Sequence, residues 1–355
     1  MSQVLELTKK LISSPSTREN FSELKNVLEI AKNELKDFEC KEFTSAGIPS
    51  LIFYNTALVP DSYKVILNAH LDVVPGQPEQ YKAKIKNGKL FGRGACDMKS
   101  GAAAEILAFK EVASMVKYPL GLQLVTDEEI GGFLGTKYQI DQGVKAEFVI
   151  AGESTNLQLN NKAKGVFWIK ISSKGNPAHA AYLWNGKNAI WAMKTFLDRV
   201  EQTFPVPTDE NWTTTANLAK IETTNTTFNK VPDDCTVSLD IRYIPEDSST
   251  IEKKLRALIP AGFKVEVQSL EPAQFTDSTN PILNKLSESI LKVLGHYTGF
   301  ISKHGASDVR HYDRKKIPGV CFGPIGDGLH SDDEWCDIDS LDKYYQILTD
   351  FLLTL

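Results

Sequence analysis

The chain has 355 residues, of which 42% are hydrophobic and 24% charged, and its formal net charge is −5. This composition is typical of a globular protein of about two domains. Because basic residues are not in excess, we do not expect the protein to bind nucleic acid. No apolar run approaches the ~20 residues that a membrane span requires, so we expect no membrane association.

The first 150 residues alternate between helical and strand patterns. Apolar residues at helical spacing predict a helix at the N-terminus and further helices over 20–36, from Ser100-Gly101 onward, and from Gly132 to about Gln142. Apolar strands are predicted at 50–54, 64–69, 120–126 and 147–152. Helices alternating with fully apolar strands predict an α/β fold, in which helices flank a mostly parallel central sheet.

The pattern changes between residues 164 and 276. The segments "VFWIKISSKG", "TTTANLAKIE" and "TVSLDIRYI" alternate apolar with polar residues, which is typical of a half-exposed antiparallel sheet. Helices are predicted near 186–202 and 249–258, and a strand "VCF" and a final helix follow the segment. We therefore expect a smaller α+β domain, residues 164–276, inserted into a domain formed by residues 1–163 and 277–355.

The five cysteines form no Cys-x-x-Cys pair, and their number is odd. Both features favour reduced thiols over a disulfide framework. The N-terminal segment lacks the continuous apolar stretch of a signal peptide. We therefore expect a cytoplasmic protein.

Acidic and histidine side chains recur where the predicted strands end. A single histidine or a Glu-Glu pair at such a place is usually structural or solvated. The carboxyl ends of parallel strands meet at one edge of a sheet, however, so these side chains are expected to lie close together. A cluster of carboxylates is repulsive unless cations neutralise it. The side chains are His70, Asp72, Asp97, Glu128, Glu129, Glu153 and His330.

Mixed histidine and carboxylate ligands without thiolate suit zinc, with cobalt or manganese as possible substitutes. Two histidines and three carboxylates indicate two ions with one bridging carboxylate. Asp72, two residues after His70, is placed to orient the His70 ring. Of the pair Glu128 and Glu129, one carboxylate can bind metal while its neighbour takes a proton from water.

Several motifs together resemble the di-zinc exopeptidases and amidohydrolases that include acetylornithine deacetylase, succinyl-diaminopimelate desuccinylase, aminoacylase and glutamate carboxypeptidase. They lie in the family's order between about residues 64 and 340. The motifs are "HLDVVPG", "LFGRGACDMKSGAAA", "TDEEIGG", "GESTNL", "KGNPAHAA…NGKNAI", "NKVPDDCTVSLDIR" and "HGASDVR…IPGVCFGP…LHSDDEW".

The resemblance implies a role for each matching position. His70 and Glu153 would bind one zinc, Glu129 and His330 the other, and Asp97 would bridge both. Glu128 would be the general base and then the acid for the leaving amine.

On the inserted domain, the resemblance implies that His179 helps to polarise the scissile carbonyl. In dimeric family members this histidine comes from the partner subunit, so we expect a homodimer through the inserted domain. Arg242 would bind a substrate carboxylate, with Asn229 nearby, and backbone around Gly305 and Gly323 would line the pocket. From the residues alone, Arg242 could equally form a structural salt bridge and His179 could simply be exposed.

The expected activity is cleavage of an amide or peptide bond next to a free carboxylate, by a metallopeptidase, a dipeptidase or an N-acyl-amino-acid deacylase. Desuccinylation of diaminopimelate intermediates and acetylornithine deacetylation are alternatives. Phe228 replaces the first of two adjacent asparagines typical of desuccinylases, and "NNKAKG" lacks their paired arginines, so Lys162 and Lys164 would have to supplement Arg242. An inactive metal-binding scaffold is a further alternative, although every metal position and Glu128 are filled.

Overall fold

The computed structural model describes residues 2–355, and the chain divides into two compact units. The first comprises the chain up to Lys162, Phe275–Ser302 and Ser307–Leu355, and the second comprises Ala163–Gln274 and Lys303–Ala306. The boundaries differ from those expected by one or two residues, except that Lys303–Ala306 lie with the second unit. There the backbone N–H of Lys164 donates to the carbonyl of Lys303. A role for the second unit as a lid or dimerisation domain stays a prediction.

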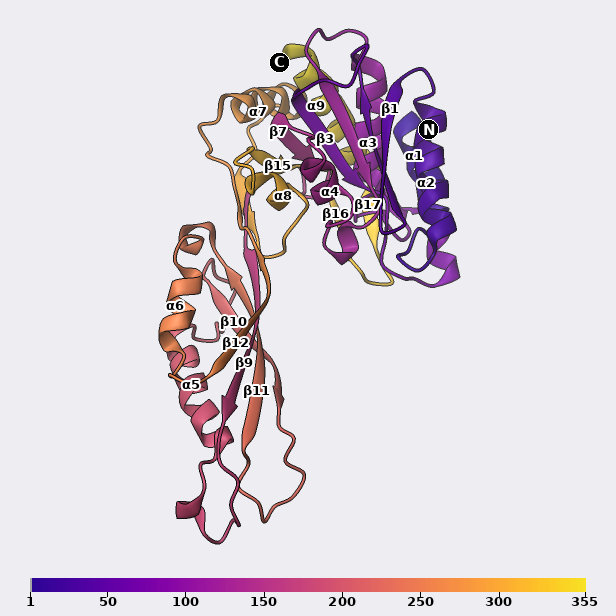
Figure 1. Ribbon diagram of the computed structural model, residues 1–355. Coiled ribbons are helices and arrows are strands. Elements are labelled where there is room, and N and C mark those ends of the chain that lie inside the picture. The colour runs from indigo at the N-terminus through magenta and orange to yellow at the C-terminus, as the bar shows by residue number, and fades with distance from the viewer. Residues whose placement is uncertain (1) are drawn as a thin grey trace. The chain divides into compact units, whose positions relative to one another are not determined.

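A nine-stranded sheet forms the centre of the first unit (Figure 1). Its order is β1-β2-β6-β3-β7-β15-β8-β13, and β14 also pairs with β8. The four central strands β6, β3, β7 and β15 run parallel, while β1, β2 and β8 pair antiparallel with their neighbours. The strands are β1 (Glu39–Ser45), β2 (Ile48–Tyr54), β3 (Tyr63–His70), β6 (Leu120–Val125), β7 (Ala146–Ala151), β8 (Leu159–Ala163), β13 (Gln274–Phe275), β14 (Phe300–Lys303) and β15 (Gly319–Cys321).

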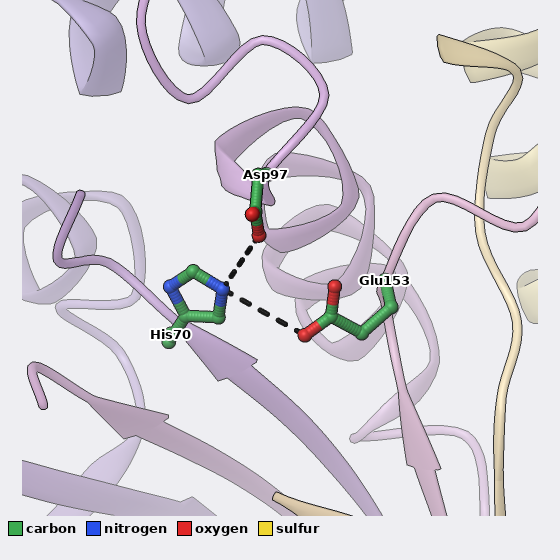
Figure 2. A group of neighbouring side chains, drawn as sticks. All are labelled: His70, Asp97 and Glu153. Atoms are coloured by element: carbon green, nitrogen blue, oxygen red, sulfur yellow. Dashed lines mark hydrogen bonds and ion pairs between the residues drawn. The ribbon is translucent and has the colours of Figure 1, made fainter. Parts of the chain in front are cut away.

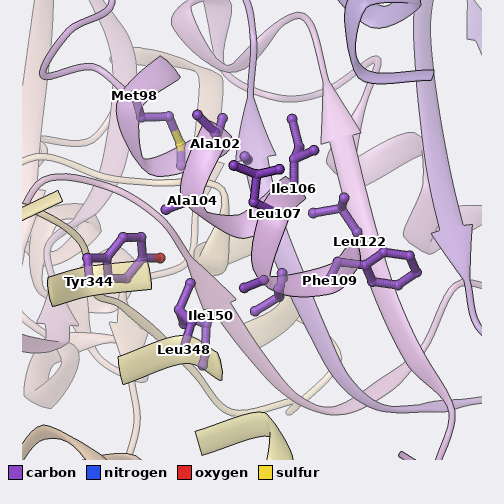
Figure 3. Packing of buried hydrophobic residues seen from close by; sticks show 14 of the residues in the cluster. Met98, Ala102, Ala104, Ile106, Leu107, Phe109, Leu122, Ile150, Tyr344 and Leu348 are labelled. Atoms are coloured by element: carbon purple, nitrogen blue, oxygen red, sulfur yellow. The ribbon is translucent and has the colours of Figure 1, made fainter. Parts of the chain in front are cut away.

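Helices cover both faces of this sheet because successive side chains of the central strands point to opposite sides. In β3, Val65 and Leu67 join the main core, whereas Ile66 packs in a second cluster with Tyr312. Figure 3 shows the main core, where Phe109 and Leu107 lie near Leu122. The helices of the main core are α1 (Gln3–Ile12), α2 (Phe21–Glu34), α3 (Lys99–Val112), α7 (Pro281–Leu294) and α9 (Ile338–Thr354), and those of the second cluster are α4 (Thr136–Asp141) and α8 (Val309–Asp313).

A small sheet joins two segments that are far apart in the sequence. Its order is β16-β17-β5-β4, and the backbone N–H of Gly92 donates to the carbonyl of Glu334. The loop after β5 therefore lies against the C-terminal segment that carries His330. The strands are β4 (Lys84–Lys86), β5 (Lys89–Phe91), β16 (Gly326–Asp327) and β17 (Trp335–Asp337).

The second unit is a four-stranded antiparallel sheet with a helical layer. The order is β10-β11-β9-β12. Alternate residues of β11, including Val237 and Leu239, are buried against Met193 and Phe196 of helix α5. The elements are β9 (Gly165–Lys174), α5 (Ala189–Thr203), β10 (Thr215–Glu222), β11 (Asp234–Tyr243), α6 (Ile251–Leu258) and β12 (Lys264–Glu271).

The predicted fold class is confirmed: helices flank a central, mostly parallel sheet. The helix expected from Gly132 instead begins at Thr136. Gly131 and Gly132 adopt φ values of 109° and 63°, a left-handed conformation that glycine tolerates and that ends helical geometry. The residues before them form a single 3-10 turn, η2 (Glu128–Ile130). Further 3-10 turns are η1 (Pro78–Tyr81), η3 (Leu183–Asn185) and η4 (Pro245–Asp247).

Candidate metal centre

Histidine and carboxylate side chains gather at the carboxyl ends of the parallel strands. His70 is the last residue of β3, Glu128 and Glu129 follow β6 in η2, and Glu153 comes two residues after β7. Asp97 lies just before α3. In open α/β sheets this edge is where ligands bind.

The first group consists of His70, Asp97 and Glu153 (Figure 2). His70 Nε2 lies 3.0 Å from Asp97 Oδ1 and 3.7 Å from Glu153 Oε1. All three side chains are buried or nearly so. One imidazole nitrogen therefore faces two carboxylates in a space largely closed to water.

The other ring nitrogen of His70 shows which tautomer a neutral ring adopts. Nδ1 lies 3.0 Å from the backbone carbonyl oxygen of Asp72 and 3.6 Å from its Oδ1. Because a carbonyl oxygen only accepts hydrogen bonds, Nδ1 carries the proton. The Nε2 lone pair of a neutral ring then points at carboxylate oxygens, an arrangement that either a proton on Nε2 or a bound metal ion would stabilise. Burial opposes charge on His70, but hydrogen bonds with Asp72 and Asp97 outweigh it and raise its pKa well above the ordinary value.

The second group consists of Asp97, Glu129 and His330. His330 Nε2 lies 3.1 Å from Asp97 Oδ2 and 3.1 Å from Glu129 Oε2. The two oxygens of Asp97 therefore face different histidines. This is the arrangement that a carboxylate bridging two ions requires.

The donor set fits a pair of divalent ions. Ligand atoms about 2.0–2.2 Å from a tetrahedral Zn²⁺ lie roughly 3.3–3.6 Å from one another. The four N···O distances here, 3.0, 3.1, 3.1 and 3.7 Å, lie within about 0.3 Å of that range. The charges also call for cations: burial and the neighbouring Asp97 raise the pKa of Glu129 to about 7. Cys96 adjoins Asp97, but burial raises the pKa of its thiol to about 12, so a thiolate ligand is disfavoured.

Asp72 has a second contact that the sequence did not suggest. Its carboxylate accepts hydrogen bonds from the backbone N–H groups of Glu128 (3.3 Å) and Glu129 (3.1 Å). One aspartate thus contacts His70 and fixes the turn that carries both glutamates. Burial raises the pKa of Glu128 well above its ordinary value; the His70 charge opposes this rise and Asp308 adds to it. Glu128 is therefore a carboxylate that takes up a proton readily.

The Asp97 loop is held by Glu334, a residue that sequence reasoning missed. The Glu334 carboxylate accepts hydrogen bonds from the backbone N–H groups of Gly94, Cys96 and Asp97 and from Arg93 Nη1, at 2.8–3.1 Å. The available signal was its place in "HSDDEW", four residues after His330.

Two glycines let neighbouring backbone segments approach the chain closely at Gly152 and Glu153. A Cβ at Gly101 of α3 would lie 1.9 Å from the carbonyl oxygen of Gly152. A Cβ at Gly323 would lie 2.4 Å from the carbonyl oxygen of Glu153. Gly323, expected near the pocket, therefore lies directly against the backbone of a candidate ligand.

The remaining predicted residues lie in the second unit. His179 is exposed, and its Nδ1 accepts a hydrogen bond from the backbone N–H of Ala181 at 3.2 Å. A neutral His179 therefore carries its proton on Nε2. The backbone carbonyl of Asn229 accepts a hydrogen bond from Ala180, next to His179, and Gly305 is exposed.

Arg242 already has a carboxylate partner. Its Nε and Nη2 atoms donate to the two oxygens of Asp240 at 2.8 and 3.0 Å. Both residues lie on β11 with one residue between them, so they share a face of the sheet.

The α/β fold therefore carries two candidate metal-ligand groups that share Asp97. The chain matches peptidase family M20/M25/M40 over residues 66–354, and it belongs to that family. Its members hydrolyse amide and peptide bonds, and this chain is such a hydrolase.

Similar proteins include both deacylases and peptidases. The chain is 26% identical to succinyl-diaminopimelate desuccinylase from Helicobacter pylori, with 95% of each chain covered. The aminopeptidase PepT from Bacillus cereus superposes with a TM-score of 0.81 at 18% identity, covering 99% of this chain and 97% of the other. A dinuclear metal-binding peptidase of the M20 family from Bacillus subtilis gives 0.71 at 15% identity, with 99% and 97% covered. Among residues 2–355, no helix is both long enough and apolar enough to cross a membrane.

Proposed function

We propose that the protein uses two Zn²⁺ ions to hydrolyse an amide or peptide bond next to a free carboxylate. His70 and Glu153 would hold one ion, Glu129 and His330 the other, and Asp97 both. The observation that carries this proposal is the position of Asp97, whose two oxygens lie 3.0 and 3.1 Å from different histidines. Co²⁺ or Mn²⁺ are possible substitutes because the donors are only nitrogen and oxygen.

Such ions supply Lewis-acid chemistry: they polarise a carbonyl and make water more acidic. Glu128 is the general base that takes the proton from the attacking water and then delivers it to the leaving amine nitrogen. Burial raises the pKa of its carboxylate, and a raised pKa suits both proton transfers. Asp72 supports them by holding the backbone of the Glu128–Glu129 turn.

His179 would donate a hydrogen bond to the carbonyl oxygen as negative charge develops there. The hydrogen bond from Ala181 to Nδ1 supports this role, because it leaves the proton on Nε2, the outward donor. Substrate contacts by Asn229 and by backbone around Gly305 and Gly323 stay predictions. So does binding of the substrate carboxylate by Arg242, which would have to exchange its Asp240 partner for the substrate.

Desuccinylation is the second candidate, favoured by the 26% identity to a desuccinylase over 95% of both chains. A succinylated substrate carries carboxylates at both ends, so it needs a second cation. Lys164 is buried, and its Nζ lies 5.7 Å from the ring of Trp212. If this candidate is correct, Lys164→Glu lowers kcat/KM for succinylated substrates more than for dipeptides.

We further propose a homodimer through the second unit. Strand β10 is an edge strand that exposes Leu218 and Ile221, and a groove of about 620 Å³ lies between it and α5. A second copy would cover both features. Light scattering that finds a fully active monomer would contradict the dimer. The cytoplasm is the proposed location, and the five cysteines, none of which forms a disulfide in the structure, support it.

The decisive experiment compares metal content and turnover in wild type and Glu128→Gln. Wild type should bind two Zn²⁺ per chain and hydrolyse members of a panel of dipeptides and N-acyl amino acids. Glu128→Gln should bind both ions while kcat falls about 10²- to 10⁴-fold, the usual contribution of a general base. Glu129→Gln is the matched control, because it should lose one ion. Full activity in Glu128→Gln would remove the mechanism.

A further inference from the structure

The turn that carries Glu128 and Glu129 is held from two sides. We call residues 127–132 the glutamate loop. On one side, Asp72 accepts the backbone N–H groups of Glu128 and Glu129. On the other side lies the short helix α8, which contacts the far end of the loop.

Two side chains of α8 converge on one carbonyl oxygen. Arg310 Nη2 donates to Gly131 O at 2.6 Å, and His311 Nε2 lies 2.9 Å from the same oxygen. Since a carbonyl oxygen only accepts, His311 Nε2 is the donor. The ring of His311 also packs edge-on against Phe133, with centroids 5.6 Å apart.

These two donors are buried, and removing polar groups from water costs free energy. Arg310 is 5% exposed and His311 is 1% exposed. In residues 2–355, Arg310 has no carboxylate within ion-pairing distance, and its other hydrogen bond goes to the carbonyl of Ser307 at 2.7 Å. Its charge also acts on Asp308, where it partly offsets the rise in pKa that burial causes. Its two hydrogen bonds, to Ser307 O at 2.7 Å and to Gly131 O at 2.6 Å, are similarly short, and the second one ties α8 to the glutamate loop.

This end of the loop is also held by the backbone N–H of Lys137, which donates to the carbonyl of Gly132 at 2.9 Å, whereas the two side chains of α8 hold the carbonyl of Gly131. Gly131 and Gly132 both have positive φ, so their backbone is intrinsically permissive. Within the loop, Gly131 N–H donates to Glu128 O and Gly132 N–H donates to Asp127 O, so its two ends are coupled. A shift of Gly131 would therefore be transmitted to Glu128.

We infer that Arg310 and His311 are positioning residues, which clamp Gly131 and thereby set the geometry of the proposed base Glu128 and the proposed ligand Glu129. The inference rests on the proposed function. It adds residues that touch neither substrate nor metal but determine how well the loop presents its two carboxylates. Substituting residues of this kind typically lowers metal affinity or activity about 10- to 100-fold.

The test uses His311→Leu, which removes the donor, and His311→Gln, whose amide can still donate. Cobalt titration followed by visible absorbance measures metal affinity, and steady-state kinetics gives kcat and KM. We expect His311→Leu to weaken the second cobalt ion about 10- to 100-fold and to lower kcat with KM nearly unchanged. His311→Gln should recover most of both. If His311→Leu does not fold, Arg310→Lys, which keeps the charge but loses the forked donor, decides the question.

A folded His311→Leu or Arg310→Lys variant with wild-type cobalt affinity and kcat would overturn the inference. Hydrogen exchange of amides 127–132 gives a readout that requires neither metal nor turnover, and we expect it to accelerate in both variants. If wild type itself binds no metal and cleaves nothing, the proposed function fails. Unchanged exchange in that loop would separately refute the clamp.

Discussion

Glu334 accepts a hydrogen bond from the backbone N–H of Asp97 at 3.0 Å, although the two residues are 237 positions apart in the sequence. The same carboxylate binds Arg93 and the N–H groups of Gly94 and Cys96. It is 2% exposed. Because Asp97 belongs to both metal-ligand groups, Glu334 controls the position of the residue that the two groups share.

Replacing Glu334 by glutamine should therefore weaken metal binding without removing a ligand. The glutamine amide would turn N–H donors toward backbone N–H groups, and hydrogen bonds to a charged acceptor, worth about 1.5–3 kcal/mol each, would be lost. We expect both metal affinities to fall about 10- to 100-fold and the melting temperature to fall as well. Isothermal titration with Zn²⁺ measures the first effect. The exposed Glu19→Gln is the control, and equal affinities in the two variants would contradict the role of Glu334.

Gly101 offers a test of close packing beneath Glu153. Alanine in the first turn of α3 would gain at most about 1 kcal/mol from helix propensity. The new Cβ, however, would lie 1.9 Å from the carbonyl oxygen of Gly152, so α3 or the end of β7 must shift. Overpacking of this kind typically costs about 1–3 kcal/mol. We expect Gly101→Ala to lower both the melting temperature and the affinity of the ion at Glu153.

Gly299→Ala is the matched control for Gly101→Ala. No atom lies within 4 Å of a Cβ at Gly299, so we expect a change within ~0.5 kcal/mol. If Gly101→Ala behaves in the same way, the packing of α3 on β7 is looser than the structure indicates.

The parts of the site that follow strand periodicity were predictable from sequence. His70, Glu128 and Glu153 follow apolar strands, and parallel strands bring their ends together whatever loops intervene. The ion pair of Arg242 with Asp240 was also accessible, because residues i and i+2 of a strand share a face. Sequence reasoning weighed such a salt bridge against carboxylate binding but did not name its partner.

Other contacts could not be predicted because nothing local encodes them. The contact of Glu334 with the Asp97 loop depends on how β17 pairs with β5, a tertiary pairing between very short strands. Helix α8 has five residues, too few to show a helical period. Arg310 stands in the motif "HGASDVR", but nothing local indicates that Arg310 or His311 contacts Gly131. The double role of Asp72 arises from a hydrogen bond to backbone groups, which are present at every position and carry no sequence signature.

Asp313 gives a prediction for stability as a function of pH. Burial raises the pKa of its carboxyl to about 8, and the hydrogen bond from the Phe275 N–H to Oδ1 only partly offsets this rise. Its Oδ2 has no partner in the described chain. Because the unfolded carboxyl releases its proton near pH 4 and the folded one only near pH 8, the unfolded state binds fewer protons between these values. Wild-type stability is therefore lost progressively as the pH rises from about 4 to about 8.

Asp313→Asn removes this ionisation while its Oδ1 can still accept from Phe275. The variant should match wild type near pH 4 and become more stable than wild type as the pH rises to 8, because each pKa unit between the folded and unfolded carboxyl corresponds to about 1.4 kcal/mol. Melting temperatures measured between pH 4 and 9 test this, with the exposed Asp61→Asn as control. A stability difference that does not change with pH would show that Asp313 ionises in the folded protein as readily as in the unfolded chain.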